Sequence, residues 1–193
     1  MNLLPSLATP LVIAIDIQRE YITPGRPFRL NGIEPALENC RRVLEHAREE
    51  RWPIAHTRHL QDSHLFNADT EYSRFIEGFE PLPHEMVFVK NMLSCFSSPE
   101  FAKMMETAKR HPIYVIGFNA QMCCLSTLVD GFHRGHRMSL VADATWARST
   151  ALGDERESYP WIKQILAVYA DIVDTEEVLA IGGRQTMYAG LER

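Results

Sequence analysis

Ile113-Tyr-Val-Ile116 is the most strand-like run of the chain, and it is followed by Gly117 and a helical pattern over 122–132. Short runs rich in β-branched residues predict strands that are buried on both faces. The same alternation of apolar runs and helical patterns extends outward to both ends of the sequence. It predicts parallel strands joined by right-handed crossovers, with helices on both faces of the sheet. The predicted strands are 11–15, 53–57, 86–89, 113–116, 138–142 and 171–173, and the predicted helices are 35–51, 99–110, 122–132, 155–169 and a short one from Thr175.

Length and composition are those of a single globular domain over residues 1–193. The chain has 20 Lys+Arg and 25 Asp+Glu, a net charge of −5, with 46% hydrophobic and 23% charged residues. These values exclude a disordered or fibrous chain, and the acidic balance disfavours nucleic acid or an anionic membrane as a partner. Apolar runs such as 11–15 are too short to cross a bilayer, and the N-terminus lacks the basic region typical of a signal peptide.

Four cysteines, at positions 40, 95, 123 and 124, form neither a disulfide framework nor paired zinc-ligand spacing. We therefore expect a cytoplasmic protein with reduced thiols. Redox chemistry between Cys123 and Cys124 is disfavoured, because adjacent Cα atoms lie about 3.8 Å apart, closer than a relaxed disulfide prefers.

Chemically active side chains follow several of the predicted strands. In open parallel sheets, functional residues collect at the carboxyl ends of the strands. An acid, a lysine and a cysteine at three such ends would supply an acid/base, an electrostatic partner and a nucleophile. The residues at these ends are Asp16, then Arg58 and His59, then Lys90, then the segment 118–123, which includes Cys123, and finally Asp143.

Cys123 is expected at or near the first turn of a helix, where free N–H groups and the helix dipole lower a thiol pKa. The same N–H groups can hold the negative oxygen of a tetrahedral intermediate. Asp16 would accept the thiol proton, and Lys90 would hold Asp16 in place. The plain alternative is that Cys123 is a small buried apolar residue, Asp16 a helix cap and Lys90 a solvated side chain.

Three motifs occur in a fixed order along the chain. They are Ile13-Ala-Ile-Asp16-Ile-Gln18-Arg-Glu-Tyr21, then Val87-Phe-Val-Lys90 followed by Ser94-Cys95-Phe96, then Gly117-Phe-Asn-Ala-Gln-Met-Cys123-Cys-Leu-Ser-Thr127, with Gly135 and the strand end 141–144 beyond them. In residue type, order and spacing they resemble the motifs of the isochorismatase-like cysteine hydrolases, which include nicotinamidases and N-carbamoylsarcosine amidohydrolases. The resemblance covers nearly the whole chain.

The resemblance implies a three-layer Rossmann-like α/β fold and a catalytic triad of Asp16, Lys90 and Cys123. It also implies a cis peptide bond between Phe118 and Asn119, an oxyanion hole formed by the N–H groups of Asn119 and Cys123, and a homodimer or larger homo-oligomer. Members that act on the vinyl ether of isochorismate generally lack the cysteine. Cys123 therefore favours cleavage of a C–N bond in a small amide, ureide or carbamoyl compound.

Two departures from the family pattern bear on the substrate. Ala120-Gln121-Met122 stands where the usual loop has Thr-Asp or a similar polar pair, and Cys124 replaces the usual Val. The alternative function is that of a non-catalytic relative that binds a small molecule or a protein. The residues expected to contact a substrate are Gln18, Tyr21, Phe118 and Trp146.

His56, His59 and His64 cluster around the end of the second predicted strand. Nicotinamidases of the resembled family bind a metal there through an Asp-x-His arrangement, whereas Thr57-Arg58-His59 stands in this chain. We therefore expect no metal and no other cofactor, with histidines at the surface or lining a pocket. The missing arrangement disfavours nicotinamide as the substrate.

Overall fold

The computed structural model describes residues 9–151 and 153–182, so the prediction made from the N-terminal segment lies outside the described residues. Six parallel strands form one sheet in the order β3-β2-β1-β4-β5-β6, which confirms the predicted parallel α/β architecture. The strands are β1 (Leu11–Ile15), β2 (Ile54–His59), β3 (Met86–Lys90), β4 (Ile113–Phe118), β5 (Ser139–Trp146) and β6 (Asp171–Val173).

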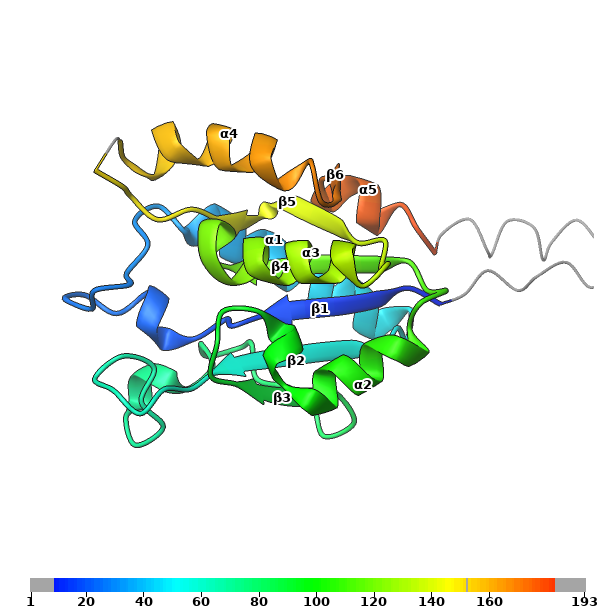
Figure 1. Cartoon of the computed structure of the whole chain (residues 1–193), viewed down its shortest axis with the longest axis horizontal. Helices are drawn as coiled ribbons and strands as arrows, with labels where there is room; N and C mark the ends of the chain where they lie inside the picture. Colours follow the sequence, from blue (N-terminus) through cyan, green and yellow to red (C-terminus); the bar gives the residue numbers. More distant parts are fainter. Residues whose placement is uncertain (1–8, 152, 183–193) are drawn as a thin grey trace, which may run out of the picture.

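Helices cover both faces of this sheet, which gives the three layers (Figure 1). Buried residues of α1 and α5 pack in one core cluster, and those of α2, α3 and α4 pack in the cluster on the other face. No helix of the described ranges is long and apolar enough to cross a membrane. The helices are α1 (Glu34–Glu49), α2 (Pro99–Thr107), α3 (Leu125–His133), α4 (Glu155–Leu166) and α5 (Thr175–Leu179), with short 3-10 turns over Arg19–Tyr21, Glu71–Ser73 and Cys95–Ser97 and a π-helical turn over Ala120–Cys124.

Local sequence explains where these helices begin. Ser98 caps α2, and its hydroxyl accepts a hydrogen bond from the Phe101 N–H. Asp154 caps α4 and Asp174 caps α5, each in a reciprocal capping box with a glutamate three residues later. The predicted helices 35–51, 99–110 and 155–169 are all longer than the observed ones, because apolar spacing continues past the last hydrogen-bonded turn.

Four strands extend past their predicted carboxyl ends: β3 by one residue, β2 and β4 by two, and β5 by four. Gly117 was expected to end β4, but it lies inside the strand, paired with Ile15 of β1 and Thr145 of β5. Its φ of 106° lies where residues with side chains are rarely found, and a Cβ at this position would stand 2.1 Å from the Ile15 carbonyl oxygen. The close approach of β4 to β1 therefore requires glycine. β5 in turn continues to Trp146, so Asp143 lies within the strand and not at its end.

A buried ion network joins the end of α1 to β2. Arg48 donates through Nε at 2.8 Å and Nη2 at 3.0 Å to the two carboxylate oxygens of Glu85, whose side chain is 2% exposed. His56 Nε2 lies 2.8 Å from Glu85 Oε2, and the Leu82 N–H donates to the same oxygen at 2.9 Å. Burial acts to raise the pKa of Glu85, but these hydrogen bonds outweigh it and lower the pKa to about 2.

Candidate active site

Asp16 supplies a fully buried carboxylate directly after the central strand β1. The residue adopts a left-handed backbone conformation with φ of 48°, a region that Asp tolerates better than most residues. The Thr57 hydroxyl donates to Asp16 Oδ1 at 2.9 Å, and Lys90 Nζ forms an ion pair with Oδ2 at 2.7 Å. Apart from this ion pair, Oδ2 has no partner among the described residues, so it keeps a lone pair that can accept a proton.

Lys90, the last residue of β3, brings its ammonium group to the same point. Nζ lies 3.0 Å from His59 Nδ1, 3.2 Å from the Met92 carbonyl oxygen and 3.4 Å from Cys123 Sγ, in addition to its ion pair with Asp16. Burial alone would lower the Lys90 pKa, but the negative charge of Asp16 outweighs burial and raises it. Lys90 is therefore a permanent buried cation at neutral pH.

Cys123 lies in the π-helical turn that connects β4 to α3. The peptide bond between Phe118 and Asn119 is cis, as the resemblance implied. The turn itself bonds back to Asn119, whose carbonyl accepts from the N–H groups of Met122 and Cys124 at 3.3 and 3.2 Å. Thr127 holds the C-terminal end of this turn, because its hydroxyl donates to the Cys123 carbonyl at 2.7 Å. The thiol is thus held on the first turn after β4, beside Asp16 and Lys90.

The predicted ionisation of Cys123 is corrected by its surroundings. The helix N-terminus was expected to lower the thiol pKa. Instead, burial and the neighbouring charge of Asp16 raise the Cys123 pKa well above its ordinary value, although Lys90 acts in the opposite direction. A side chain that is 4% exposed has lost most of the water that would stabilise a thiolate. The resting nucleophile is therefore a thiol that needs a base.

His59, predicted at the end of the second strand but without a catalytic role, is a further member of this cluster. It is 2% exposed, and its ring nitrogen lies within hydrogen-bonding distance of Lys90. The signal available in the sequence was its position at the carboxyl end of β2, beside the strand that ends in Lys90. Burial first, and then the charge of Lys90, lower the pKa of His59. The ring is therefore neutral at neutral pH.

Asp16, His59 and Cys123 are the group of side chains in the described ranges whose donor atoms gather closely enough for a metal ion, all within 4.8 Å of one another. The Lys90 ammonium, however, contacts all three of these side chains. A metal ion would have to displace that buried cation, so this donor set does not fit a metal while Lys90 is in place. Thr57 and Arg58, which stand before His59, bond to Asp16 and to the Ser73 carbonyl respectively.

Gln18 and Phe118, expected at the substrate, have other roles in the structure. The Gln18 amide is fully buried and makes three hydrogen bonds to backbone groups, two with His59 and one with Ser73. This structural role replaces the expected substrate contact. Phe118 contributes its peptide bond to the site, while its side chain is fully buried in the core beside Tyr21.

Tyr21, a residue predicted to contact the substrate, lies next to the nucleophile. Its ring packs edge-on against Phe66 with centroids 5.4 Å apart, and its side chain is 1% exposed. Burial, followed by the proximity of Cys123 and Asp16, raises the Tyr21 pKa, so its hydroxyl keeps its proton. Tyr21 is thus a neutral hydrogen-bonding group at the thiol.

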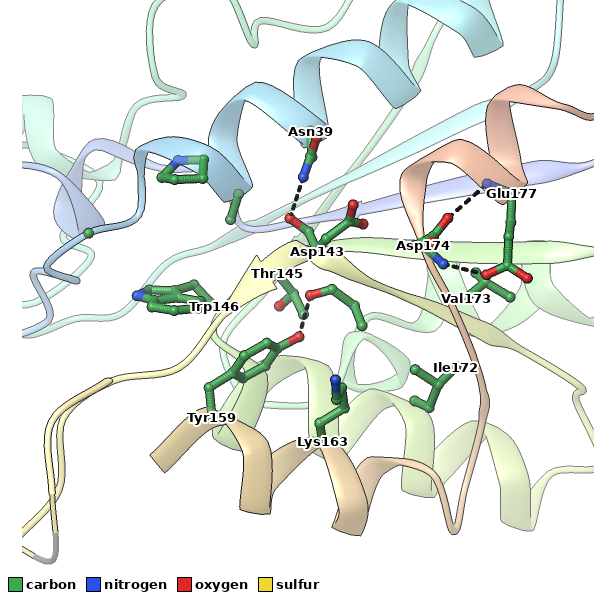
Figure 2. Close-up of a pocket in the computed structure, with 14 residues that line it drawn as sticks. Asn39, Asp143, Thr145, Trp146, Tyr159, Lys163, Ile172, Val173, Asp174 and Glu177 are labelled. Carbon is green, nitrogen blue, oxygen red and sulfur yellow. Dashed lines mark hydrogen bonds between the residues drawn. The ribbon is translucent and has the colours of Figure 1, made fainter. Parts of the chain in front are cut away.

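Trp146 lies in a separate cavity of about 490 Å³ between α1, β5, β6, α4 and α5 (Figure 2). None of Asp16, Lys90 and Cys123 lines this cavity. The indole N–H donates to the Asn31 carbonyl at 2.9 Å, and the ring lies 5.2 Å from that of Tyr159. Trp146 pairs with Phe118 of the neighbouring strand β4, and its side chain lines this cavity and not a surface shared with the three residues there.

Cys124 points away from the site. It is fully buried, and its Sγ lies 3.6 Å from the Gly117 carbonyl oxygen and 3.7 Å from the Thr145 hydroxyl. Burial raises the Cys124 pKa to about 12. The adjacent thiol is therefore a packing residue, as its position in place of the family's Val suggested.

With the geometry established, comparison with known proteins shows what the chain is similar to. The family model described as "Isochorismatase domain" matches residues 10–177. YddQ, an isochorismatase family protein of Bacillus subtilis (strain 168), is 27% identical over 179 residues, which cover 89% of this chain and 99% of that protein. N-carbamoylsarcosine amidase of Arthrobacter sp is 24% identical, covering 66% and 56% respectively. The crystal structure of an isochorismatase from Pseudomonas putida KT2440 superimposes with a TM-score of 0.80 at 28% identity, covering 91% of this chain and 93% of that one.

Proposed function

Because the chain belongs to the isochorismatase family of hydrolases, we propose that it cleaves a C–N bond of a small amide, ureide or carbamoyl compound through a covalent acyl-enzyme on Cys123. One observation carries this proposal. A buried carboxylate oxygen of Asp16 has the Lys90 ammonium as its one partner among the described residues, and it lies in the same cluster as a neutral thiol. Such a cluster contains a base, a nucleophile and a fixed positive charge.

The first half of the reaction begins with proton transfer from Cys123 Sγ to Asp16 Oδ2. The resulting thiolate attacks the substrate carbonyl carbon, and the Lys90 ammonium 3.4 Å from Sγ stabilises the negative charge as it develops. In the tetrahedral intermediate the oxyanion accepts hydrogen bonds from the N–H groups of Asn119 and Cys123. The C–N bond then breaks, Asp16 gives its proton to the leaving nitrogen, and ammonia or an amine departs from a thioester.

The second half of the reaction regenerates the thiol. Asp16, again ionised, takes a proton from a water molecule, and the hydroxide that forms attacks the thioester carbonyl. The C–S bond breaks, Asp16 returns its proton to the sulfur, and an acid or carbamate leaves. One carboxylate therefore acts as base and acid in turn, which requires an oxygen that can accept a proton beside its ion pair with Lys90.

The proposal also covers the location, the oligomeric state and the partners of the protein. We expect a cytoplasmic homodimer or larger homo-oligomer whose partner is a small-molecule substrate, with neither nucleic acid nor membrane involved. No resident cofactor is needed for the steps above. The alternative, a non-catalytic binding relative, is disfavoured because the acid, the lysine and the thiol are all kept in contact.

The test is a screen of small amides, ureides and carbamoyl compounds for release of ammonia or an amine. With the best compound, Asp16→Asn, Lys90→Ala and Cys123→Ala should each lower kcat/KM by at least about 100-fold, since each removes a base, a fixed charge or the nucleophile. Cys124→Val is the matched control, because it changes the adjacent thiol and should keep most of the activity.

Circular dichroism and thermal unfolding of each variant separate lost chemistry from lost folding. A folded variant that loses less than about tenfold removes that residue from the mechanism. If no compound releases a nitrogen product and iodoacetamide leaves Cys123 unmodified, the non-catalytic alternative holds.

A further inference from the structure

We infer that His59 is a positioning residue whose neutral imidazole accepts a hydrogen bond from the Lys90 ammonium and so holds that ammonium between Asp16 and Cys123. This inference rests on the proposed function only in that it assigns Lys90 its role beside the thiol. It adds a fourth residue to the cluster, one that acts on the charge and not on the substrate.

The number of acceptors around Lys90 is the first argument. An ammonium group has three protons, and four acceptors lie within 3.4 Å of Nζ: Asp16 Oδ2, His59 Nδ1, the Met92 carbonyl and Cys123 Sγ. The sulfur is the most distant of the four. The other three hold the ammonium while Cys123 is a neutral thiol, and one proton must turn to the sulfur when it ionises.

The tautomer of His59 follows from the same contact. A lysine ammonium can only donate, so a ring nitrogen 3.0 Å from it must present a lone pair. The proton of the neutral ring is then on Nε2. Burial and the Lys90 charge, which lower the His59 pKa, act in the same direction, since they exclude a second proton from the ring.

Both the backbone and the ring of His59 are held by neighbouring residues. His59 and Lys90 are paired residues on the neighbouring parallel strands β2 and β3, so their side chains leave the sheet together. The Gln18 amide accepts from the His59 N–H at 2.8 Å and donates to its carbonyl at 3.0 Å. The Phe66 ring packs edge-on against the imidazole at 5.0 Å. Gln18 thus positions His59, which in turn positions Lys90.

Loss of Nδ1 would leave a proton of a buried ammonium without its acceptor. The ammonium would then be held by Asp16 and the Met92 carbonyl alone, and its position relative to Cys123 would no longer be set. Because the Lys90 charge lowers the Cys123 pKa, a displaced ammonium leaves less thiolate at a given pH. The rate of Cys123 alkylation therefore reports the position of the ammonium without any substrate.

The experiment compares two substitutions that separate ring shape from the acceptor atom. His59→Phe keeps the ring and removes Nδ1, whereas His59→Asn removes the ring and keeps an acceptor at the corresponding place. We expect iodoacetamide to alkylate Cys123 about 10- to 100-fold more slowly in His59→Phe at mildly alkaline pH, because a displaced ammonium lets the thiol pKa rise by about one to two units. Most of that loss should be recovered in His59→Asn. His84→Phe, the same change at an exposed histidine, is the matched control.

Equal rates in wild type and a folded His59→Phe variant would overturn the inference, as would equal losses in the two His59 variants. If His59→Phe fails to fold, nitrogen NMR of the imidazole in the wild-type protein decides. We expect the Nε2–H tautomer near neutral pH, and an Nδ1–H tautomer or an imidazolium would overturn the inference. Neither readout needs turnover, so both test the role of His59 even if no compound of the substrate panel is hydrolysed.

Discussion

Replacing Glu85 by Gln tests how much the ion network of Arg48, Glu85 and His56 contributes to folding stability. The Glu85 carboxylate accepts hydrogen bonds from Arg48 and the Leu82 N–H and lies 2.8 Å from His56 Nε2. These contacts hold its pKa at about 2 against an ordinary 4.5. At 1.36 kcal/mol per pH unit, the charged form of Glu85 contributes about 3 kcal/mol to folding stability.

The stability that Glu85 contributes should fall as the pH falls. A carboxylate whose pKa is lowered in the folded state contributes its full stability above the unfolded value of 4.5. That contribution is lost as the pH falls from 4.5 toward 2. Because a protonated glutamate resembles glutamine, the difference in unfolding free energy between wild type and Glu85→Gln should be about 3 kcal/mol at neutral pH and should shrink toward zero over this range.

Urea denaturation at a series of pH values measures the difference directly. Glu77→Gln, the same change at an exposed position, serves as the control and should leave the unfolding free energy nearly unchanged. A difference between wild type and Glu85→Gln that stays constant from neutral pH to pH 3, or that is below about 1 kcal/mol at neutral pH, would refute the reasoning.

Three other predictions follow from the site. Gly117→Ala should destabilise the protein by at least about 3 kcal/mol or prevent folding, because a Cβ would meet the Ile15 carbonyl; thermal unfolding measures this, and a normal melting temperature would contradict it. Dialysis against a chelator should leave activity unchanged, since Lys90 already contacts the donor atoms; a loss that zinc, iron or manganese restores would show a metal requirement. Substoichiometric iodoacetamide should label Cys123 rather than Cys124, and faster as pH rises, because burial and Asp16 raise the Cys123 pKa; mass mapping that finds the label on Cys124, or rapid labelling in mild acid, would count against this assignment.

Much of the fold could be predicted from local pattern. The apolar runs 11–15 and 171–173 match β1 and β6 residue for residue. The exceptions are strand ends shaped by neighbouring strands. Gly117 ordinarily favours a turn, but the lack of a side chain is what lets β4 approach Ile15 and continue to Phe118. Such an approach depends on the partner strand, which local sequence does not describe.

The site was predictable in position and less so in chemistry. Asp16, Lys90 and Cys123 meet because the carboxyl ends of parallel strands share one edge, a consequence of topology. The ionisation of Cys123 depends on how much water reaches it and on its distance to Asp16. The spacing of the motifs predicts neither of these quantities. His59 was predicted at a strand end without a role beside Lys90 for a related reason, since a histidine becomes part of such a cluster only through the contacts of its ring.

The pairing of Ile15 with Gly117 also bears on how such an enzyme diversifies. Asp16 follows Ile15, and the turn that carries Cys123 starts at Ala120, three residues after Gly117. The separation of acid and thiol is therefore set by adjacent central strands. Insertions and exchanges in the long connection between β2 and β3 leave that separation alone. A laboratory recombination experiment could therefore graft this connection from a homologue without changing the pairing of β1 with β4, provided that Phe66 and Ser73, which contact His59 and Gln18, are kept.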